Sequence, residues 1–345
     1  MFGRYPQASL WQYDPAQPWD LSSNPAPPLE IGESQSRPQA FLELEALPDT
    51  VAVASVPDGG LHGGAITLWQ PGSGSHEVFR HVVEDQTPVA LVGHAGIVIG
   101  GTSVEGGYGI DPVTAEAVLF GWDPTSGQTL WQHVPVPGAA TVSGLLVDED
   151  DLLWGIADGS TVFAVDLETR QTLHTTVIDA DAQPDRYGSS DRLLLDNGRL
   201  FGSAANRIFL MDRVTREVTT LHGGLSEDPT ESVRDLAQDR HGDLYFVGAG
   251  SKLLKYTMPA DRTAPTVTAA TVPAEPRSGR AVHVRLTASD DGAGRPRIHY
   301  RVGDQEWETY RRPVPVPPGE VLQYRAVDAA GNASRVESID PAGRR

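Results

Sequence analysis

Three long loops in the sequence carry side chains that could bind or transform a ligand. These are His62 in PDGGLHGG (57–64), Glu105 and Tyr108 in VEGGYGIDPVTAEA (104–117), and Arg186 and Tyr187 in DADAQPDRYGSS (179–190). Each loop is longer than its counterparts elsewhere in the chain, and loops of unusual length commonly carry function. We therefore predict that these five residues form a ligand-binding site.

The residue types indicate a sugar ligand with a negative charge. Aromatic rings stack on the faces of pyranose rings, and an arginine can pair with the carboxylate of a uronic acid. The same residues could catalyse β-elimination, in which a Tyr or His removes a proton and an Arg neutralises the carboxylate. The catalytic candidates for that alternative are His62, Tyr108, Arg186 and Tyr187. Plain loop variation is the alternative without function.

The sequence predicts no cofactor, although a divalent cation remains an open alternative. The acidic run 148–151 lacks the alternating ligand spacing and the glycine bend of a calcium loop, so we interpret it as a solvated turn. The chain has no cysteine, which excludes disulfides, thiol nucleophiles and zinc–thiolate sites. No metal site is therefore assigned.

Repeated strand pairs must position these loops. Three stretches align on the pattern Asp-x-x-[Ser/Thr]-[Gly/Arg], and their aspartates are Asp123, Asp166 and Asp212. A looser copy has Gln70 in the place of the aspartate. Another strand pair precedes each copy, as in RLLLDNGRLFGSA (192–204), where Asn197-Gly198 signals a hairpin turn. Each unit therefore reads as a four-stranded antiparallel meander of about 45 residues, typical of a β-propeller blade.

The turn sequence DPTSGQTLWQ (123–132) resembles the PQQ-like repeat of bacterial β-propellers. The resemblance covers about residues 9–258 and implies a propeller domain over residues 1–257. Gln70 departs from the pattern, and no Trp follows Thr172 or Thr219, so binding of the quinone PQQ is not carried over. A β-sandwich with chance turns is the alternative fold.

The strand assignment leaves the closure of the ring open. We assign two strands before residue 33, four complete blades from about 40 to 222, and three strands up to about 256. A strand from the N-terminus could complete the last blade, or the chain could be an N-terminally truncated piece of a larger propeller. We favour the second interpretation, which predicts unpaired edges at both ends of the array.

A second domain is predicted over residues 263–341. Alternation in VHVRLTA (282–288) and RIHYRV (297–302) indicates a small β-sandwich. The stretch YRAVDAAGNAS (324–334) resembles bacterial Ig-like modules, which serve as spacers or adhesion modules. The segment 258–266 is expected to be a stiff linker that few contacts cross and that proteases cut first.

Net charge limits the class of partner. The formal charge of −19 should repel nucleic acid and anionic lipid, and no run is apolar enough to span a bilayer. The first residues lack the pattern of a signal peptide, whereas the Ig-like resemblance implies a secreted or cell-surface protein.

Three functions stay open at this point. The favoured one is binding of a polysaccharide or cell-envelope glycan, with the second domain as a spacer. The alternatives are a propeller-type polysaccharide lyase or glycoside hydrolase, and a scaffold for protein partners.

Overall fold

The chain folds as a series of small antiparallel β-sheets. The computed structural model describes residues 1–182, 185–196, 199–223, 233–239, 242–248, 252–258, 261–272, 282–290 and 295–341. These residues contain strands and turns but no helix, which confirms the all-β class. The described residues therefore include no helix that is long and apolar enough to cross a membrane.

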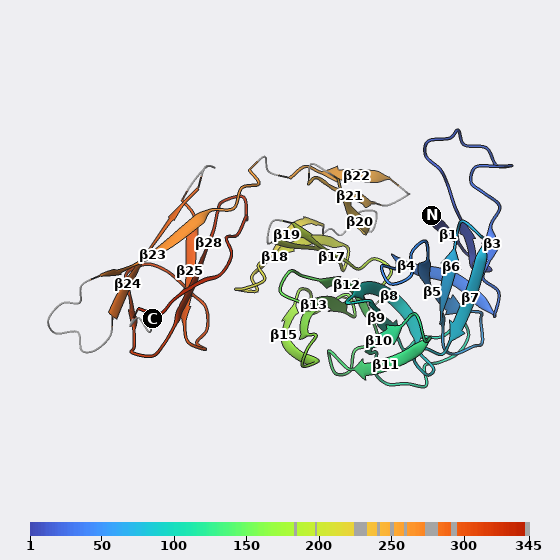
Figure 1. Ribbon diagram of the computed structural model, residues 1–345, viewed down its shortest axis with the longest axis horizontal. Helices are drawn as coiled ribbons and strands as arrows, with labels where there is room; N and C mark the ends of the chain where they lie inside the picture. The colour runs from blue at the N-terminus through green and yellow to red at the C-terminus, as the bar shows by residue number, and fades with distance from the viewer. Residues whose placement is uncertain are drawn as a thin grey trace.

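Four consecutive sheets have four strands each, as the repeat predicts (Figure 1). Within each sheet, neighbouring strands are consecutive in the chain and antiparallel. The strands are β4 (Gln35–Glu43), β5 (Val51–Pro57), β6 (Ala65–Gln70) and β7 (Ser75–Arg80); β8 (Thr87–His94), β9 (Ile97–Ser103), β10 (Leu119–Asp123) and β11 (Gln128–His133); β12 (Val142–Val147), β13 (Leu152–Ala157), β14 (Thr161–Asp166) and β15 (Gln171–Val177); and β16 (Arg192–Asp196), β17 (Arg199–Ala204), β18 (Arg207–Met211) and β19 (Val218–Gly223).

Three-stranded sheets lie at both ends of this array. The first contains β1 (Phe2–Arg4), β2 (Ser9–Trp11) and β3 (Leu29–Glu30), so the prediction of two strands before residue 33 was one strand short. The last contains β20 (Arg234–Gln238), β21 (Leu244–Val247) and β22 (Leu253–Tyr256). In the described residues β22 pairs with β21 alone, and neither β2 nor β3 pairs with it. No strand pairing in that part of the chain joins the two end sheets.

The repeated aspartate shapes the turn that joins the third and fourth strands of a sheet. The carboxylate of Asp123 accepts hydrogen bonds from the backbone N–H of Thr125 at 2.8 Å and from the hydroxyl of Ser126 at 2.7 Å. Gln70 accepts comparable bonds from Ser73 and Ser75. The Gly/Arg position of the motif has a positive φ in every copy, at Gly74, Gly127, Arg170 and Arg216. The motif is therefore a turn signature. Glycine adopts a positive φ without steric cost, which explains why Gly74 and Gly127 occupy its last position.

A recurring glycine–phenylalanine pair builds the core of three sheets. Phe120, Phe163 and Phe209 are fully buried on the third strands of their sheets. Each lies opposite a glycine of the second strand, and the pairs are Gly100 with Phe120, Gly155 with Phe163, and Gly202 with Phe209. A Cβ on these glycines would lie 2.1–2.3 Å from the phenylalanine ring. The ring therefore occupies the space that the missing side chain leaves.

The C-terminal part has two sheets that share one core. One sheet contains β23 (Thr266–Val272), β24 (Val282–Ser289) and β27 (Val314–Val316). The other contains β25 (Arg297–Val302), β26 (Glu308–Thr309), β28 (Leu322–Val327) and β29 (Glu337–Ile339). Val284, Leu286, Leu322 and Tyr324 are among the apolar side chains that pack between them. The C-terminal part is therefore built from two antiparallel sheets around one apolar core.

Arginines connect the two parts of the chain, contrary to the expectation of few contacts. Arg325 of β28, whose side chain is 3% exposed, forms an ion pair with Asp212. Arg262 pairs with Asp196 at 2.7 Å, and the buried Arg199 donates to the carbonyl of Ala330 at 3.1 Å. The junction between the two parts of the chain therefore consists of specific polar contacts. Residues 259–260 of the expected linker, and the predicted Asn197-Gly198 turn, lie outside the described residues.

Candidate functional site

The three long loops predicted to carry the site contact one another. The loops after β5 and β9 share two backbone hydrogen bonds, from Gly60 to Tyr108 at 2.8 Å and from Gly107 to Leu61 at 2.9 Å. The loop after β15 joins them through the Ser103 hydroxyl, which donates to the carbonyl of Arg186 at 2.7 Å. Segments far apart in the sequence therefore form one surface.

Glycines allow the first two loops to approach so closely. A Cβ on Gly107 would lie 1.9 Å from the carbonyl oxygen of Asp58, and one on Gly106 would lie 2.5 Å from that of Leu61. No other residue type fits these positions without moving backbone. The Gly106-Gly107 pair before Tyr108 thus has a packing function.

Arginines and tyrosines alternate at the centre of this surface. Arg186 forms an ion pair with Glu105 at 2.6 Å, and its guanidinium lies 5.2 Å from the ring centre of Tyr108 and 5.7 Å from that of Tyr187. Such distances are within the range of cation–π contacts. The sequence prediction expected Arg186 to be available for an acidic ligand, but Glu105 already neutralises it.

Arg37, at the start of β4, is the residue that the sequence analysis missed. Its guanidinium lies 4.6 Å from the ring centre of Tyr5 and 5.8 Å from those of Tyr108 and Tyr187. It also donates to the hydroxyl of Tyr108 at 3.3 Å. Within the described part of the chain, no carboxylate lies within ion-pairing distance of Arg37. We call Tyr5, Arg37, Glu105, Tyr108, Arg186 and Tyr187 the tyrosine–arginine cluster.

Tyr187 differs from the sequence prediction because it is a packing residue. Its side chain is 2% exposed and packs with Val56 and Val89. Its hydroxyl donates to the carbonyl of Gly106 at 2.7 Å. Burial raises the pKa of this hydroxyl, which makes it a poor base. Tyr108 is 53% exposed and presents the accessible ring of the cluster.

His62 lies beside the cluster. Its Cα is 3.3 Å from the point where a Cβ of Gly106 would lie, so its loop borders the glycine pair. Its Nδ1 is buried and has no hydrogen-bond partner among the described residues. The structure therefore brings the loops of all five predicted residues together, with His62 at the edge.

The acidic turn after β12 pairs with an arginine. The carboxylate of Asp148 accepts from Arg213 at 2.7 Å and from the indole N–H of Trp154 at 2.7 Å. Glu149 pairs with Arg213 at 2.6 Å. Protein donors thus bind these two carboxylates.

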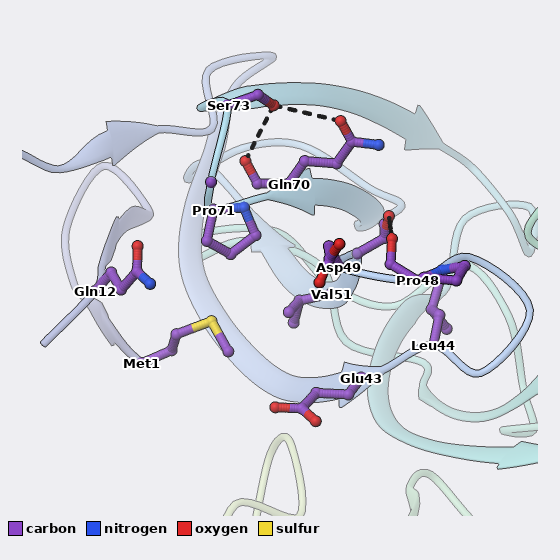
Figure 2. A pocket seen from close by; sticks show the side chains of 12 residues that line it. Met1, Gln12, Glu43, Leu44, Pro48, Asp49, Val51, Gln70, Pro71 and Ser73 are labelled. Atoms are coloured by element: carbon purple, nitrogen blue, oxygen red, sulfur yellow. Dashed lines mark hydrogen bonds between the residues drawn. The ribbon is translucent and has the colours of Figure 1, made fainter. Parts of the chain in front are cut away.

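A pocket of about 720 Å³ lies elsewhere on the chain (Figure 2). The turns after β4 and β6 line it, together with Met1 and Gln12 from the N-terminal segment. Its acidic side chains are Glu43 and Asp49, and its lining contains no arginine, lysine, histidine or aromatic residue. This chemistry does not suit an acidic sugar, so the pocket is not our candidate site.

Comparison with known proteins gives only distant similarity. No family model matches the sequence, and no curated protein matches it. Among solved structures, the chain is similar to the extracellular domain of a hybrid two-component system from B. thetaiotaomicron, with a TM-score of 0.47, 12% identity, and coverage of 93% of this chain and 46% of that one. A second such domain from the same organism has a TM-score of 0.36, 12% identity, and coverage of 90% and 51%. The chain spans about half the length of these structures.

Proposed function

We propose that this chain is a secreted or cell-surface β-propeller that binds an acidic polysaccharide at the tyrosine–arginine cluster. The C-terminal sandwich is then an Ig-like spacer or adhesion module. The PQQ-like turn motif and the succession of four-stranded meanders support the propeller. The observation that carries the function is Arg37, a guanidinium among tyrosine rings with no carboxylate partner in the described residues.

The chemistry of the cluster suits a uronic acid. Arg37 offers N–H donors to a carboxylate, and a guanidinium matches the two oxygens of that group. Tyr108 offers an exposed ring next to it, on which a sugar face can stack. The net charge of −19 would repel an anionic polymer elsewhere, so a local positive group directs it to this surface.

Isothermal titration with a uronate polysaccharide and with a neutral glucan tests the proposal. We expect saturable binding of the uronate polymer and none of the glucan. Arg37→Ala should weaken binding by about 1.5–3 kcal/mol, the contribution of a hydrogen bond to a charged group. Unchanged affinity in this variant would contradict the proposed site.

Arg170→Ala is a matched control. Arg170 also lies over an aromatic ring, 5.4 Å from the centre of Trp131, but it belongs to the turn between β14 and β15. Its removal should leave the affinity unchanged. A loss of binding in both variants would indicate a general electrostatic attraction and would refute a specific site.

The enzyme and scaffold alternatives have distinct readouts. A new absorbance near 235 nm during incubation with the uronate polymer would indicate a lyase with His62 or Tyr108 as the base. Capture of a protein and not a glycan from cell envelope would indicate a scaffold. The proposal expects neither result and predicts no bound cofactor.

A further inference from the structure

The loop that carries Arg186 and Tyr187 closes over a buried carboxyl group. Asp191 directly follows this loop and is 2% exposed, and its Oδ2 accepts a hydrogen bond of 2.6 Å from the Ser143 hydroxyl. Within the described part of the chain, the Asp191 carboxyl group has no second hydrogen-bond donor and no ion pair. A buried carboxylate with one neutral donor is costly, so this environment favours the protonated form.

The charged groups around Asp191 give its carboxylate little compensation. Asp158, on the turn between β13 and β14, and Asp185, on the same loop as Arg186, both act on it as negative charges. Arg192 acts on it as a cation, but its guanidinium donates to the Asp191 backbone carbonyl at 2.7 Å and pairs with Asp235 of β20 at 3.6 Å. Burial is the largest influence, and it raises the pKa of the Asp191 carboxyl group to about 7.

The backbone at Gly188 leaves no space for water to hydrate a charged Asp191. A Cβ on Gly188 would lie 2.4 Å from the hydroxyl oxygen of Ser143 and 3.2 Å from Oδ2 of Asp191. Two backbone hydrogen bonds of 3.1 Å hold Gly188 there, from its N–H to the Asp185 carbonyl and from the Asp191 N–H to its own carbonyl. Water can therefore reach the carboxylate only if this loop moves.

The same loop supplies part of the tyrosine–arginine cluster. Arg186 and Tyr187 directly precede Gly188. The hydroxyl of Tyr187 donates to the carbonyl of Gly106 at 2.7 Å, and its ring centre lies 5.8 Å from the guanidinium of Arg37. A displacement at Gly188 would therefore move the tyrosine ring that lies beside Arg37.

We propose that protonation of Asp191 controls ligand binding at the tyrosine–arginine cluster. With a neutral Asp191, the loop stays closed and the cluster keeps the arrangement that suits an acidic sugar. An ionised Asp191 admits water, displaces residues 185–190 and adds a negative charge beneath the site, and each of these effects disfavours an anionic ligand. This inference rests on the proposed function, because it concerns the regulation of the same site.

Isothermal titration with the uronate polymer at pH 6 and at pH 8 tests this control. The carboxylates of the polymer are ionised at both pH values, so the ligand itself does not change. If the closed loop alone binds, the competent fraction of the protein falls from about nine-tenths at pH 6 to about one-tenth at pH 8, and the affinity should fall roughly tenfold. Asp191→Asn keeps the shape of the neutral group and should bind equally at both pH values.

Glu168→Gln is a matched control, because it removes an exposed carboxylate from the turn between β14 and β15. This variant should keep the roughly tenfold dependence of the wild type. Equal affinity of the wild type at the two pH values would overturn the proposal. A dependence that persists in Asp191→Asn would also overturn it and would point to another titrating group, such as His62.

Hydrogen exchange without ligand separates the loop movement from the proposed function. At pH 8 the amides of residues 185–191 should exchange at least about fivefold faster in the wild type than in Asp191→Asn, and at pH 6 the two proteins should be alike. Comparison at one pH cancels the intrinsic effect of pH on exchange. Equal exchange at pH 8 would overturn the proposal whether or not the polymer binds. Absence of uronate binding at pH 6 would refute the proposed function, and the control of binding with it, even where this exchange difference is present.

Discussion

Asp191 is a buried carboxylate at the base of the loop that carries Arg186 and Tyr187. It is 2% exposed, and its Oδ2 accepts from the Ser143 hydroxyl at 2.6 Å. Burial raises its pKa from the usual 3.8 to about 7, more than the hydrogen bond from Ser143 lowers it. The folded chain therefore prefers the protonated form. The resulting stabilisation is complete below pH 3.8 and is lost as the pH rises toward 7.

Asp191→Asn should remove this pH dependence. At pH 8 the variant should be more stable than the wild type by up to about 4 kcal/mol, the limit set by the pKa difference. At pH 4 the two proteins should be alike. Urea unfolding followed by tryptophan fluorescence at both pH values measures the difference. Parallel pH profiles for the two proteins would show that Asp191 does not titrate in the folded chain as described.

Glu105 tests the electrostatics of the proposed binding site. It neutralises Arg186, and both side chains are about a quarter to a third exposed. Glu105→Gln should release the positive charge of Arg186, so the affinity for a uronate polymer should rise, by roughly three- to tenfold at low salt. Titration at low and high ionic strength measures this gain, which salt should reduce. Weaker binding in the variant would instead indicate that Glu105 contacts the ligand.

At the scale of the strand, the glycine–phenylalanine pairs are the most sensitive positions. A Cβ on Gly155 would lie 2.3 Å from the ring of Phe163, which is fully buried. Gly155→Ala should therefore destabilise the fold by about 1–3 kcal/mol, the usual effect of overpacking a core. Gly72→Ala is the control, since nothing lies within 4 Å of its added methyl group. Thermal unfolding of both variants tests this, and equal midpoints would contradict the packing argument.

At the scale of the whole molecule, the ion pair between Arg325 and Asp212 connects the two parts. Burial alone would raise the pKa of Asp212, but the charge of Arg325 and hydrogen bonds from backbone N–H groups hold it below 3.8. The stabilisation is therefore present above pH 3.8 and is lost as the pH falls through the lowered pKa. Acid should loosen the junction.

Arg325→Met should cost about 3 kcal/mol near pH 6, because it leaves a partly buried carboxylate without its cation. The difference from the wild type should shrink as the pH falls below the lowered pKa of Asp212. Arg297→Met is the matched control, since its pair with Glu217 spans 3.7 Å between side chains more than 60% exposed. That change should cost less than about 1 kcal/mol. Equal losses in both variants would show that burial of the pair is unimportant.

Local rules explain what the sequence predicted well. Strand alternation, the Asp-x-x-[Ser/Thr]-[Gly/Arg] turn and the repeat length depend on neighbouring residues, and they predicted the four-stranded sheets between β4 and β19. Unusual loop length located the loops that carry His62, Glu105, Tyr108, Arg186 and Tyr187. No local signal distinguished Arg37, because it is an ordinary arginine at the start of a strand.

The sequence by itself determined the all-β class, the four-stranded units, the two-sheet C-terminal part and the strong negative charge, because turn chemistry, alternation and composition are local or additive. Only the tertiary structure decided which charges neutralise one another. Glu105 and Arg186, or Asp212 and Arg325, are 81 and 113 residues apart, as their numbers show. Their pairing depends on how whole sheets and loops are placed in space. The same placement leaves Arg37 without a carboxylate partner in the described part of the chain and brings Asp261, Asp290 and Asp328 together.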